Sequence, residues 1–372
     1  ARAARTGGIE ATDLEVVTVT PTSVTFGFAS YTAPHPAYGP LRPTVPTLGE
    51  VAMAPADDPL AVQDPVGSAA IPGPAGSWLR PGMPDLPVVA ASDSDTGFHL
   101  VTVEGLEPGR EYVFECRCDG VPATPGLMTT AMPGSPEVSG RITPLTPPPG
   151  DHVTTIAILN DTHIGEEKHG LILGDPWGEE FVPRQTMWRT DVGGLRVIGI
   201  DSSMLDESGG RIEEAQFEAL EAELAADPAR PTLLMAHHPV TVEAAFTNVG
   251  TPAFTLNLDH SDRLQRMLAA TPGAFLMAAG HTHRARRTAP DAARNVDFVE
   301  FGSAAGYPGG YTLVHLHTGG YQVNFHRTGS PEALRWSSRS RWAMYGLNPE
   351  YTLGATEHRN YVVHRDLSGL AR

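Results

Sequence analysis

The sequence predicts two domains, an all-β sandwich followed by an α/β domain whose strands end in polar residues. Three observations predict this division. Short stretches rich in Val, Thr and Phe recur in residues 1–132, a Pro-rich linker fills residues 133–150, and strands alternate with helical patterns over residues 151–330. A chain of 372 residues also has room for two domains of ordinary size.

The predicted sandwich consists of short strands separated by turn residues. Residues 31–96 are crowded with Pro, Gly, Ala and Asp, so we expect most of that stretch to be loop. Strand character is interrupted at Pro21 and returns after the loop-rich stretch. The expected strands are Leu14–Thr20, Val24–Ser30, Gly49–Ala54, Leu86–Ala91, Phe98–Val103 and Glu111–Cys118.

Cys116 and Cys118 are the two cysteines of the chain. In a strand, residues two apart point to the same face. This geometry suits a disulfide poorly and supplies only half of a zinc site. We interpret both as small, half-buried residues that do not require an oxidising compartment.

The second domain shows the alternation of a layered α/β fold. Residues 211–226 carry apolar residues on one helical face, and a shorter helix ending at Leu268 is expected to be capped by Ser261 or Asp262. Polar residues follow the apolar strands, as at functional edges of α/β sheets. The expected strands are Thr154–Leu159, Arg196–Ile200, Thr232–Ala236, Phe275–Ala279 and Phe298–Phe301, and a hairpin of Tyr311–His317 and Tyr321–Arg327.

Three of these strand ends carry side chains that bind metal ions. Carboxylate oxygen and neutral imidazole suit divalent ions such as Mn, Fe and Zn. In extended chain, residues i and i+2 share a face, so both ligands of a D-x-H or H-x-H motif reach one small volume. Each motif alone is weak, but the three together predict a metal site. The motifs are Asp161-x-His163, His237-His238-Pro239 and Gly280-His281-x-His283.

The order of these motifs resembles that of the calcineurin-like metallophosphoesterases, in particular bacterial cyclic-nucleotide phosphodiesterases and purple acid phosphatases. Residues 191–203 and the helix at residues 211–226 resemble the corresponding strand pair and helix, so the resemblance spans about residues 151–330. It implies a four-layer α/β/β/α metallophosphoesterase sandwich. It also implies a dinuclear site for two divalent or trivalent metal ions, Mn, Fe or Zn.

Carried over residue by residue, the resemblance implies a ligand for the first ion at each of Asp161, His163 and His283. His237 and His281 would help to hold the second ion, and His238 would be a neighbouring pocket residue. The implied activity is hydrolysis of a small phosphoester by attack of a metal-bound hydroxide, with a phosphodiester favoured over a phosphomonoester. No catalytic acid is assigned.

The sequence departs from this family between Asp161 and the helix at residues 211–226. The family has a Gly-Asp motif, whose Asp bridges both ions, and a Gly-Asn-His motif, but only Gly174-Asp175 is present. Three explanations stay open: an internal segment near residues 171–178 is missing, the site is truncated, or Asp175 is the bridging carboxylate. The alternative function is a non-catalytic metal-binding or interaction module with an incomplete site.

A second resemblance concerns the end of the first domain. His99–Val103 followed by Gly105–Tyr112 resembles the last turns of fibronectin type III domains, in which a Leu and a Tyr fill the core around a Gly-x-Pro-Gly turn. The resemblance covers about 25 residues well. It implies a fibronectin type III-like sandwich over residues 1–132, similar to the domain that precedes the catalytic domain in purple acid phosphatases.

The net charge of −17 argues against a nucleic-acid partner, because such proteins present a basic face to phosphates. The one tight basic cluster, Arg284, Arg286 and Arg287, is either a solvated loop or an attractor of phosphate. No run of about 18 apolar residues predicts a membrane span. A cytoplasmic location is favoured, with secretion after processing as the alternative, and the oligomeric state is not predicted.

Residues 331–372 are expected to form a C-terminal extension packed on the core. Its aromatic residues suggest an anchored tail, with a substrate lip or a dimer contact as the alternative. His315 and His317 lie two apart in a predicted strand and therefore face one side. We interpret them as ordinary strand histidines.

Overall fold

The structure, a computed structural model, describes residues 8–33, 43–58, 71–72, 78–79, 86–126, 134–162, 184–205, 207–341 and 349–371. The chain divides into two compact units. Unit 1 comprises Ala1–Pro147, His326–Tyr351 and Ala355–Asn360, and unit 2 comprises Pro148–Phe325, Thr352–Gly354 and Tyr361–Arg372. Residues 331–372, expected to form one extension on the core, are therefore divided between the two units.

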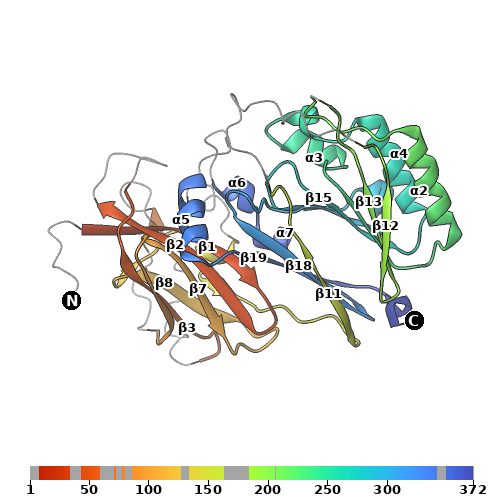
Figure 1. Cartoon of the computed structure of the whole chain (residues 1–372). Coiled ribbons are helices and arrows are strands. Elements are labelled where there is room, and N and C mark those ends of the chain that lie inside the picture. Colours follow the sequence, from red (N-terminus) through yellow and green to blue (C-terminus); the bar gives the residue numbers. More distant parts are fainter. Residues whose placement is uncertain are drawn as a thin grey trace. The chain divides into compact units, whose positions relative to one another are not determined.

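Unit 1 contains two antiparallel sheets, as expected for the N-terminal part of the chain. Figure 1 shows β1, β2 and β7 side by side in the first sheet. The first sheet has the order β1 (Gly8–Val19), β2 (Ser23–Ala33), β7 (Phe98–Glu104). The second has the order β10 (Arg141–Ile142), β8 (Tyr112–Cys118), β3 (Thr47–Pro55), β6 (Val88–Ser94). Strand β9 (Val121–Pro122) also pairs with β8. A separate two-stranded sheet consists of β4 (Ile71–Pro72) and β5 (Trp78–Leu79).

Both sheets of unit 1 contribute to one apolar core. Alternate residues of the strands point inward, because successive side chains of a strand face opposite sides. Phe26 of β2 contacts Phe114 of β8 at a ring-centroid distance of 4.6 Å. Cys116 and Cys118 are free thiols in this core and are buried, rather than half-buried as expected.

The turn between β7 and β8 is built around two glycines. Gly105 and Gly109 have φ values of 75° and 73°, a region that glycine enters without steric cost. Leu106 is buried beside the turn, and the Tyr112 hydroxyl accepts a hydrogen bond of 3.0 Å from the Glu107 N–H. The side chains expected to fill the core at this turn therefore do so.

The predicted linker at residues 133–150 has structure of its own. Pro136–Ser139 form helix α1, and β10 extends the second sheet of unit 1 by pairing with β8. Glu137 of α1 accepts a hydrogen bond of 2.9 Å from the Val16 N–H, and Asn360 accepts one of 3.0 Å from the Val19 N–H. These side chains satisfy donors along β1, which lies at the edge of its sheet among the described strands.

Unit 2 also contains two sheets. The larger is mixed: β13, β14, β15 and β17 are parallel, and β12 and β16 are antiparallel edge strands. Its order is β12 (Trp188–Val192), β13 (Leu195–Ile200), β14 (Thr232–Ala236), β15 (Ala274–Ala279), β17 (Asp297–Glu300), β16 (Arg286–Thr288). The smaller sheet has the order β11 (His152–Ile158), β18 (Gly310–His317), β19 (Gly320–Arg327), β20 (Asn360–His364).

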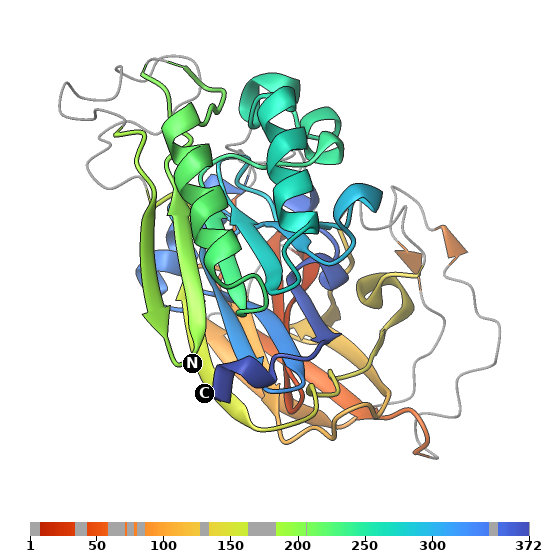
Figure 2. The same ribbon diagram turned by 90° about the vertical axis from the view of Figure 1, so that its right-hand side faces the viewer.

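The six-stranded sheet is covered on both faces. One face shares an apolar core with the four-stranded sheet, in which Phe275 packs on Tyr321. The other face packs against α2 (Glu214–Ala226) and α4 (Leu258–Ala269), as Figure 2 shows with these helices in green and blue-green. The described part of unit 2 is thus a mixed α/β arrangement of one helical layer and two sheets, and the expected fourth layer stays a prediction.

The remaining helices are short. Unit 2 contains α3 (Val242–Thr247) and 3-10 turns at Thr251–Phe254, Asp291–Ala293 and Ser368–Ala371. Unit 1 contains α5 (Pro331–Ser340) and α7 (Thr356–Arg359), and α6 spans Pro349–Leu353. No helix in the described ranges is both long and apolar enough to cross a membrane.

Helix α4 begins earlier than the sequence suggests. Its cap is Asn257, so the expected capping by Ser261 or Asp262 is wrong. Asn257 Oδ1 accepts a hydrogen bond of 3.0 Å from the Asp259 N–H. This contact satisfies one of the N–H groups that a helix start leaves without a partner, and the helix therefore starts before Ser261.

Candidate metal centre

Strand ends of unit 2 carry four of the five predicted metal ligands. Asp161 follows β11, His237 follows β14, and His281 and His283 follow β15. Because β14, β15 and β17 are parallel, their carboxyl ends lie at one edge of the sheet. An isolated bridge between Asn160 and Ser303 joins the end of β11 to the segment after β17. The fifth predicted ligand, His163, and the alternative ligand Asp175 lie outside the described residues.

Asp161 anchors the site. Its side chain is 1% exposed, and its Oδ1 and Oδ2 accept hydrogen bonds of 2.9 and 3.1 Å from the His281 N–H. Gly280 makes this approach possible, since a Cβ on Gly280 would lie 2.6 Å from Asp161 Oδ2. The glycine expected to allow a close backbone approach therefore allows the approach of the carboxylate.

Three of the four described ligands have an unusual backbone conformation. The φ values of Asp161, His281 and His283 are 51°, 67° and 55°. Residues with side chains occupy this left-handed region rarely, at a free-energy cost of about 1–3 kcal/mol each. Such strain persists only where the surroundings fix it, and it clusters at functional sites.

A hydrogen-bond network behind the site fixes this strained loop. Thr282, the spacer of the H-x-H motif, is buried and donates from Oγ1 to Glu300 Oε2 at 2.5 Å. Arg284 donates from Nε and Nη2 to the two oxygens of the same carboxylate, both at 2.8 Å. Glu300 ends β17, so the loop that carries His281 and His283 is tied to the neighbouring strand.

The donor atoms of the four ligands lie close together. His237 Nδ1 lies 3.8 Å and His283 Nε2 lies 3.7 Å from Asp161 Oδ1. His237 Nε2 lies 2.8 Å from His281 Nδ1. Two ligand atoms on one ion lie about 3–4 Å apart when each is about 2.0–2.2 Å from the metal. The first two distances fit ligands of a shared ion, whereas the third is the length of a hydrogen bond between the two rings.

The hydrogen bonds of His281 assign its tautomer. Its Nε2 lies 2.8 Å from the carbonyl oxygen of Ser208, which can only accept, so Nε2–H is the donor. Nδ1 then carries the lone pair and points toward His237. A backbone carbonyl that holds the outer N–H of a ligand histidine is common at metal sites, because it fixes the ring and the tautomer. Phe254 stacks on the same ring at a centroid distance of 4.9 Å.

His238 has a different environment from His237. It is buried, its Nε2–H donates to the Ser208 carbonyl at 3.2 Å, and its Nδ1 accepts from the Ser202 hydroxyl at 2.8 Å. Burial, and then repulsion from His281, lowers the pKa of His238 to about 3. Both ring nitrogens of His238 have partners within the protein, whereas the His237 side chain is 40% exposed. His237, His238 and His281 form a group in the described residues whose candidate ligand atoms all lie within 4.8 Å of one another. Within it, the hydrogen bonds on both ring nitrogens of His238 make His237 the better candidate ligand.

Sequence analysis missed the parts of the site that come from residues 202–210. Ser208 and Ser202 hold the histidine rings, and Gly210 leaves space for one of them, since a Cβ there would lie 2.5 Å from His238 Cγ. These residues are separated from the histidines by 28 or more positions. No local pattern links them, and only the serines that follow β13 gave any signal.

The basic cluster after the H-x-H motif is engaged with carboxylates. The expected solvated loop is wrong for Arg284, which is buried against the equally buried Glu300. Arg286 pairs with Glu243, and Arg287 pairs with Asp297 at 3.0 Å. The charges of these three side chains are therefore offset within unit 2.

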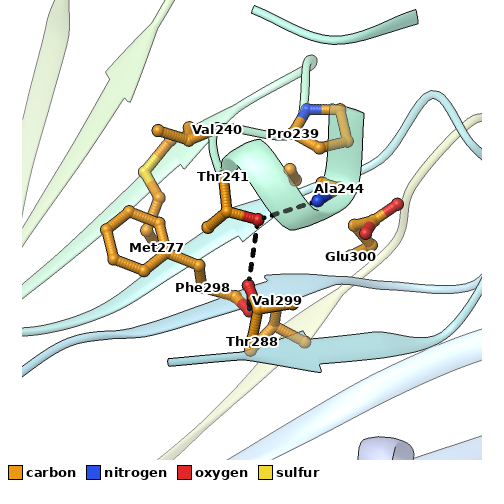
Figure 3. A pocket seen from close by; sticks show the side chains of 10 residues that line it. Pro239, Val240, Thr241, Ala244, Met277, Thr288, Phe298, Val299 and Glu300 are labelled. Carbon is orange, nitrogen blue, oxygen red and sulfur yellow. Dashed lines mark hydrogen bonds between the residues drawn. The ribbon is translucent and has the colours of Figure 1, made fainter. Parts of the chain in front are cut away.

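A small cavity lies behind the site (Figure 3). Its volume of about 10 Å³ is enough for roughly one water molecule. Thr241 and Thr288 are joined across it by a hydrogen bond of 3.2 Å, and Glu300 and Pro239 contribute to its wall. None of the described metal ligands lines this cavity, so it is a packing void rather than the substrate site.

Comparisons with known proteins do not establish a family. No family model and no curated protein matches the chain. Among solved structures, a dimetal phosphatase from Danio rerio is 13% identical with a TM-score of 0.31, over 38% of this chain and 58% of that protein. PhoD is 9% identical with a TM-score of 0.34, over 85% of each chain.

Proposed function

We propose that unit 2 is a metal-dependent phosphoesterase. The observation that carries the proposal is the convergence of Asp161, His237, His281 and His283 from separate strand ends onto one small volume. The order of these motifs in the sequence is the order found in calcineurin-like metallophosphoesterases. The mixture of one carboxylate and three imidazoles suits Mn, Fe or Zn.

The family resemblance divides the donor set between two ions. Asp161 and His283, with His163 as the further proposed ligand, would hold the first, and His237 and His281 would hold the second. When bound, such ions supply an activated water near neutral pH and offset charge on the phosphoester oxygens. None of the described residues is placed as a bridging carboxylate, and Asp175 is proposed for that role if the site is complete.

The protein's own contribution is to orient these donors before substrate arrives. The Ser208 carbonyl keeps the proton of His281 on Nε2 and leaves Nδ1 for the ion. Glu300 holds Thr282 and Arg284 and so fixes the loop between the two ligand histidines. His238 is held between the Ser202 hydroxyl and the Ser208 carbonyl, so we assign it the role of orienting its neighbours.

Replacement of a ligand tests the proposal. The variant His281→Ala should lose turnover on bis-p-nitrophenyl phosphate, measured after loading with Mn²⁺ or Zn²⁺, because a ligand of the second ion is removed. His364→Ala, at an exposed position at the end of β20, is the matched control and should keep wild-type turnover. Equal turnover of wild type and His281→Ala would overturn the proposal.

The preference for diesters is a finer part of the same proposal. Diesters are favoured because the sequence of the catalytic core resembles the phosphodiesterases more than the purple acid phosphatases. Parallel assays on bis-p-nitrophenyl phosphate and p-nitrophenyl phosphate decide this point. Faster release from the monoester would reverse the preference without affecting the metal centre.

An alternative is a metal-binding module without catalysis. It is favoured by one observation, the absence of a bridging carboxylate among the described residues of the site. Metal binding without turnover on either substrate would support this alternative. The substrate in either case would be a small molecule, with no nucleic-acid partner proposed because the charge is −17.

For unit 1 we propose a fibronectin type III-like sandwich. The support is its two antiparallel sheets around one core, together with the Leu106 and Tyr112 turn. A buried Tyr hydroxyl that bonds a backbone group a few residues upstream is typical of such sandwiches. Its place before a phosphoesterase unit would parallel the architecture of purple acid phosphatases.

A further inference from the structure

A second cluster of histidines lies on the four-stranded sheet of unit 2. His152 begins β11, and His315 and His317 end β18. The two strands are antiparallel, with His152 opposite His317 and Thr155 opposite His315. Residues opposite one another in adjacent strands have neighbouring side chains. Since His315 and His317 are two apart, all three rings lie on one face.

The ring of His152 lies near each of the other two rings. The ring centroid of His152 lies 5.3 Å from that of His317 and 6.3 Å from that of His315. Two imidazoles on one tetrahedral ion have centroids about 5 Å apart, given metal–nitrogen distances of about 2.0–2.1 Å. The first pair fits this spacing, and the second needs an approach of about 1 Å.

The Thr155 hydroxyl already brings two of the ring nitrogens to one point. It lies 2.9 Å from His152 Nε2 and 2.9 Å from His315 Nδ1. The third ring has an unused donor or acceptor, because the buried Nδ1 of His317 has no hydrogen-bond partner in the described structure. The Nδ1 atom of His317 is therefore available for a further interaction, and the rings of His152 and His315 belong to the same cluster.

We propose that His152, His315 and His317 form a mononuclear site for a transition-metal ion such as Zn²⁺ or Cu²⁺. Three neutral imidazoles with an open position are a known ligand set for zinc, and imidazole also suits copper.

This site is separate from the candidate metal centre. His152 is the first residue of β11 and Asp161 follows the end of this strand, whose length at about 3.3 Å per residue separates them by roughly 20 Å. The two sites also differ in chemistry, because this cluster is all nitrogen and the other includes the Asp161 carboxylate. The inference therefore does not depend on the proposed phosphoesterase activity.

Equilibrium dialysis against Zn²⁺, followed by elemental analysis, tests the proposal. The wild-type protein should bind one Zn²⁺ per chain more than a variant with His152→Gln, His315→Gln and His317→Gln combined. The single variant His317→Gln should bind that ion at least about tenfold more weakly. His364→Gln, at the exposed end of β20, is the matched control and should bind as wild type does. Equal Zn²⁺ binding by the wild type and the combined variant would overturn the proposal. Loss of one bound Zn²⁺ in the control variant His364→Gln would overturn it as well.

A footprint on the wild-type protein makes the test independent of whether the variants fold. Diethylpyrocarbonate modifies accessible imidazoles, and mass spectrometry locates the products. Zn²⁺ should protect the peptides that contain His152 and His315–His317 and leave His364 reactive. Equal modification of His152 and His317 with and without Zn²⁺ would also overturn the proposal.

Discussion

At the scale of single residues, the candidate metal centre depends on how closely the backbone approaches Asp161. The carboxylate occupies the space that a side chain at position 280 would fill, and three ligands have positive φ values. Such conformations are retained where surrounding contacts determine them. The contacts here are the hydrogen bonds from His281 N–H to the carboxylate and from Thr282 to Glu300.

The substitution Gly280→Ala tests this steric argument. The added Cβ would lie 2.6 Å from Asp161 Oδ2, so the carboxylate must move. We expect a loss of stability of about 1–3 kcal/mol from overpacking. We also expect turnover to fall by about a hundredfold or more, because a displacement of about 1 Å at a reacting site has that effect. Urea unfolding and phosphoester assays measure the two effects.

Gly209→Ala is the control for this variant. A Cβ at Gly209 would lie 3.5 Å from the nearest atom, the Ala253 carbonyl oxygen, which is ordinary contact. This variant should keep both stability and turnover near those of the wild type. If Gly280→Ala behaved like Gly209→Ala, the proposed close approach of the carboxylate would be wrong.

At the scale of elements, the loop after β15 is held by β17. Arg284 and Glu300 are a buried pair, at 3% and 5% exposure, with two hydrogen bonds of 2.8 Å. Arg284 also donates from Nη1 to the Thr247 carbonyl at the end of α3, at 2.8 Å. One side chain thus joins the loop to a strand and to a helix.

The substitution Arg284→Met should therefore act on stability. Removing one partner leaves the Glu300 charge buried without its counter-ion, which costs about 3–5 kcal/mol. The double variant Arg284→Met with Glu300→Gln should recover part of this loss, because no buried charge remains. The unfolding midpoint in urea measures both. If Arg284→Met kept wild-type stability and only raised KM, Arg284 would instead be a phosphate-binding residue.

The elements themselves followed largely from hydrophobic periodicity. Thr232–Ala236 was expected and is β14, because an apolar run of this length bounded by Pro231 and His237 is typical of a buried strand. The start of α4 and the structure within residues 133–150 were not foreseen. Asn257, Ser261 and Asp262 can all cap a helix, and the choice among them depends on tertiary packing. The pairing of β10 with β8 likewise depends on a partner about 30 residues away.

At the scale of the whole molecule, the sequence located the metal-binding motifs but not what orients them. His237, His281 and His283 come together because the parallel strands β14 and β15 end at a common edge. Asp161 follows β11 of the other sheet and is joined to this edge by the bridge between Asn160 and Ser303. The Ser208 carbonyl and the Glu300 carboxylate act from distant positions, and a single sequence contains no signal of such pairings. The His152 cluster was missed for the same reason, since only strand pairing brings it to His317.

Unit 1 has its own core, and the reactivity of the two thiols buried in it measures whether that core is closed to solvent. Burial raises the pKa of Cys118 to about 11 and raises the pKa of Cys116 as well. Only the thiolate reacts with Ellman's reagent, so both thiols should be unreactive at pH 8 in the native protein. Two thiols per chain should react in concentrated urea. Rapid reaction of either thiol in the native state would show that this core is open.

Anomalous diffraction from crystals grown with Mn²⁺ tests whether the four converging side chains bind metal. We expect anomalous peaks about 2.0–2.3 Å from Asp161 Oδ1 and from His281 Nδ1, with His283 and His237 as neighbouring ligands. Metal binding would also leave intact the hydrogen bond from His281 Nε2–H to the Ser208 carbonyl. Ordered, metal-free Asp161 and His281 side chains in such crystals would contradict the claim.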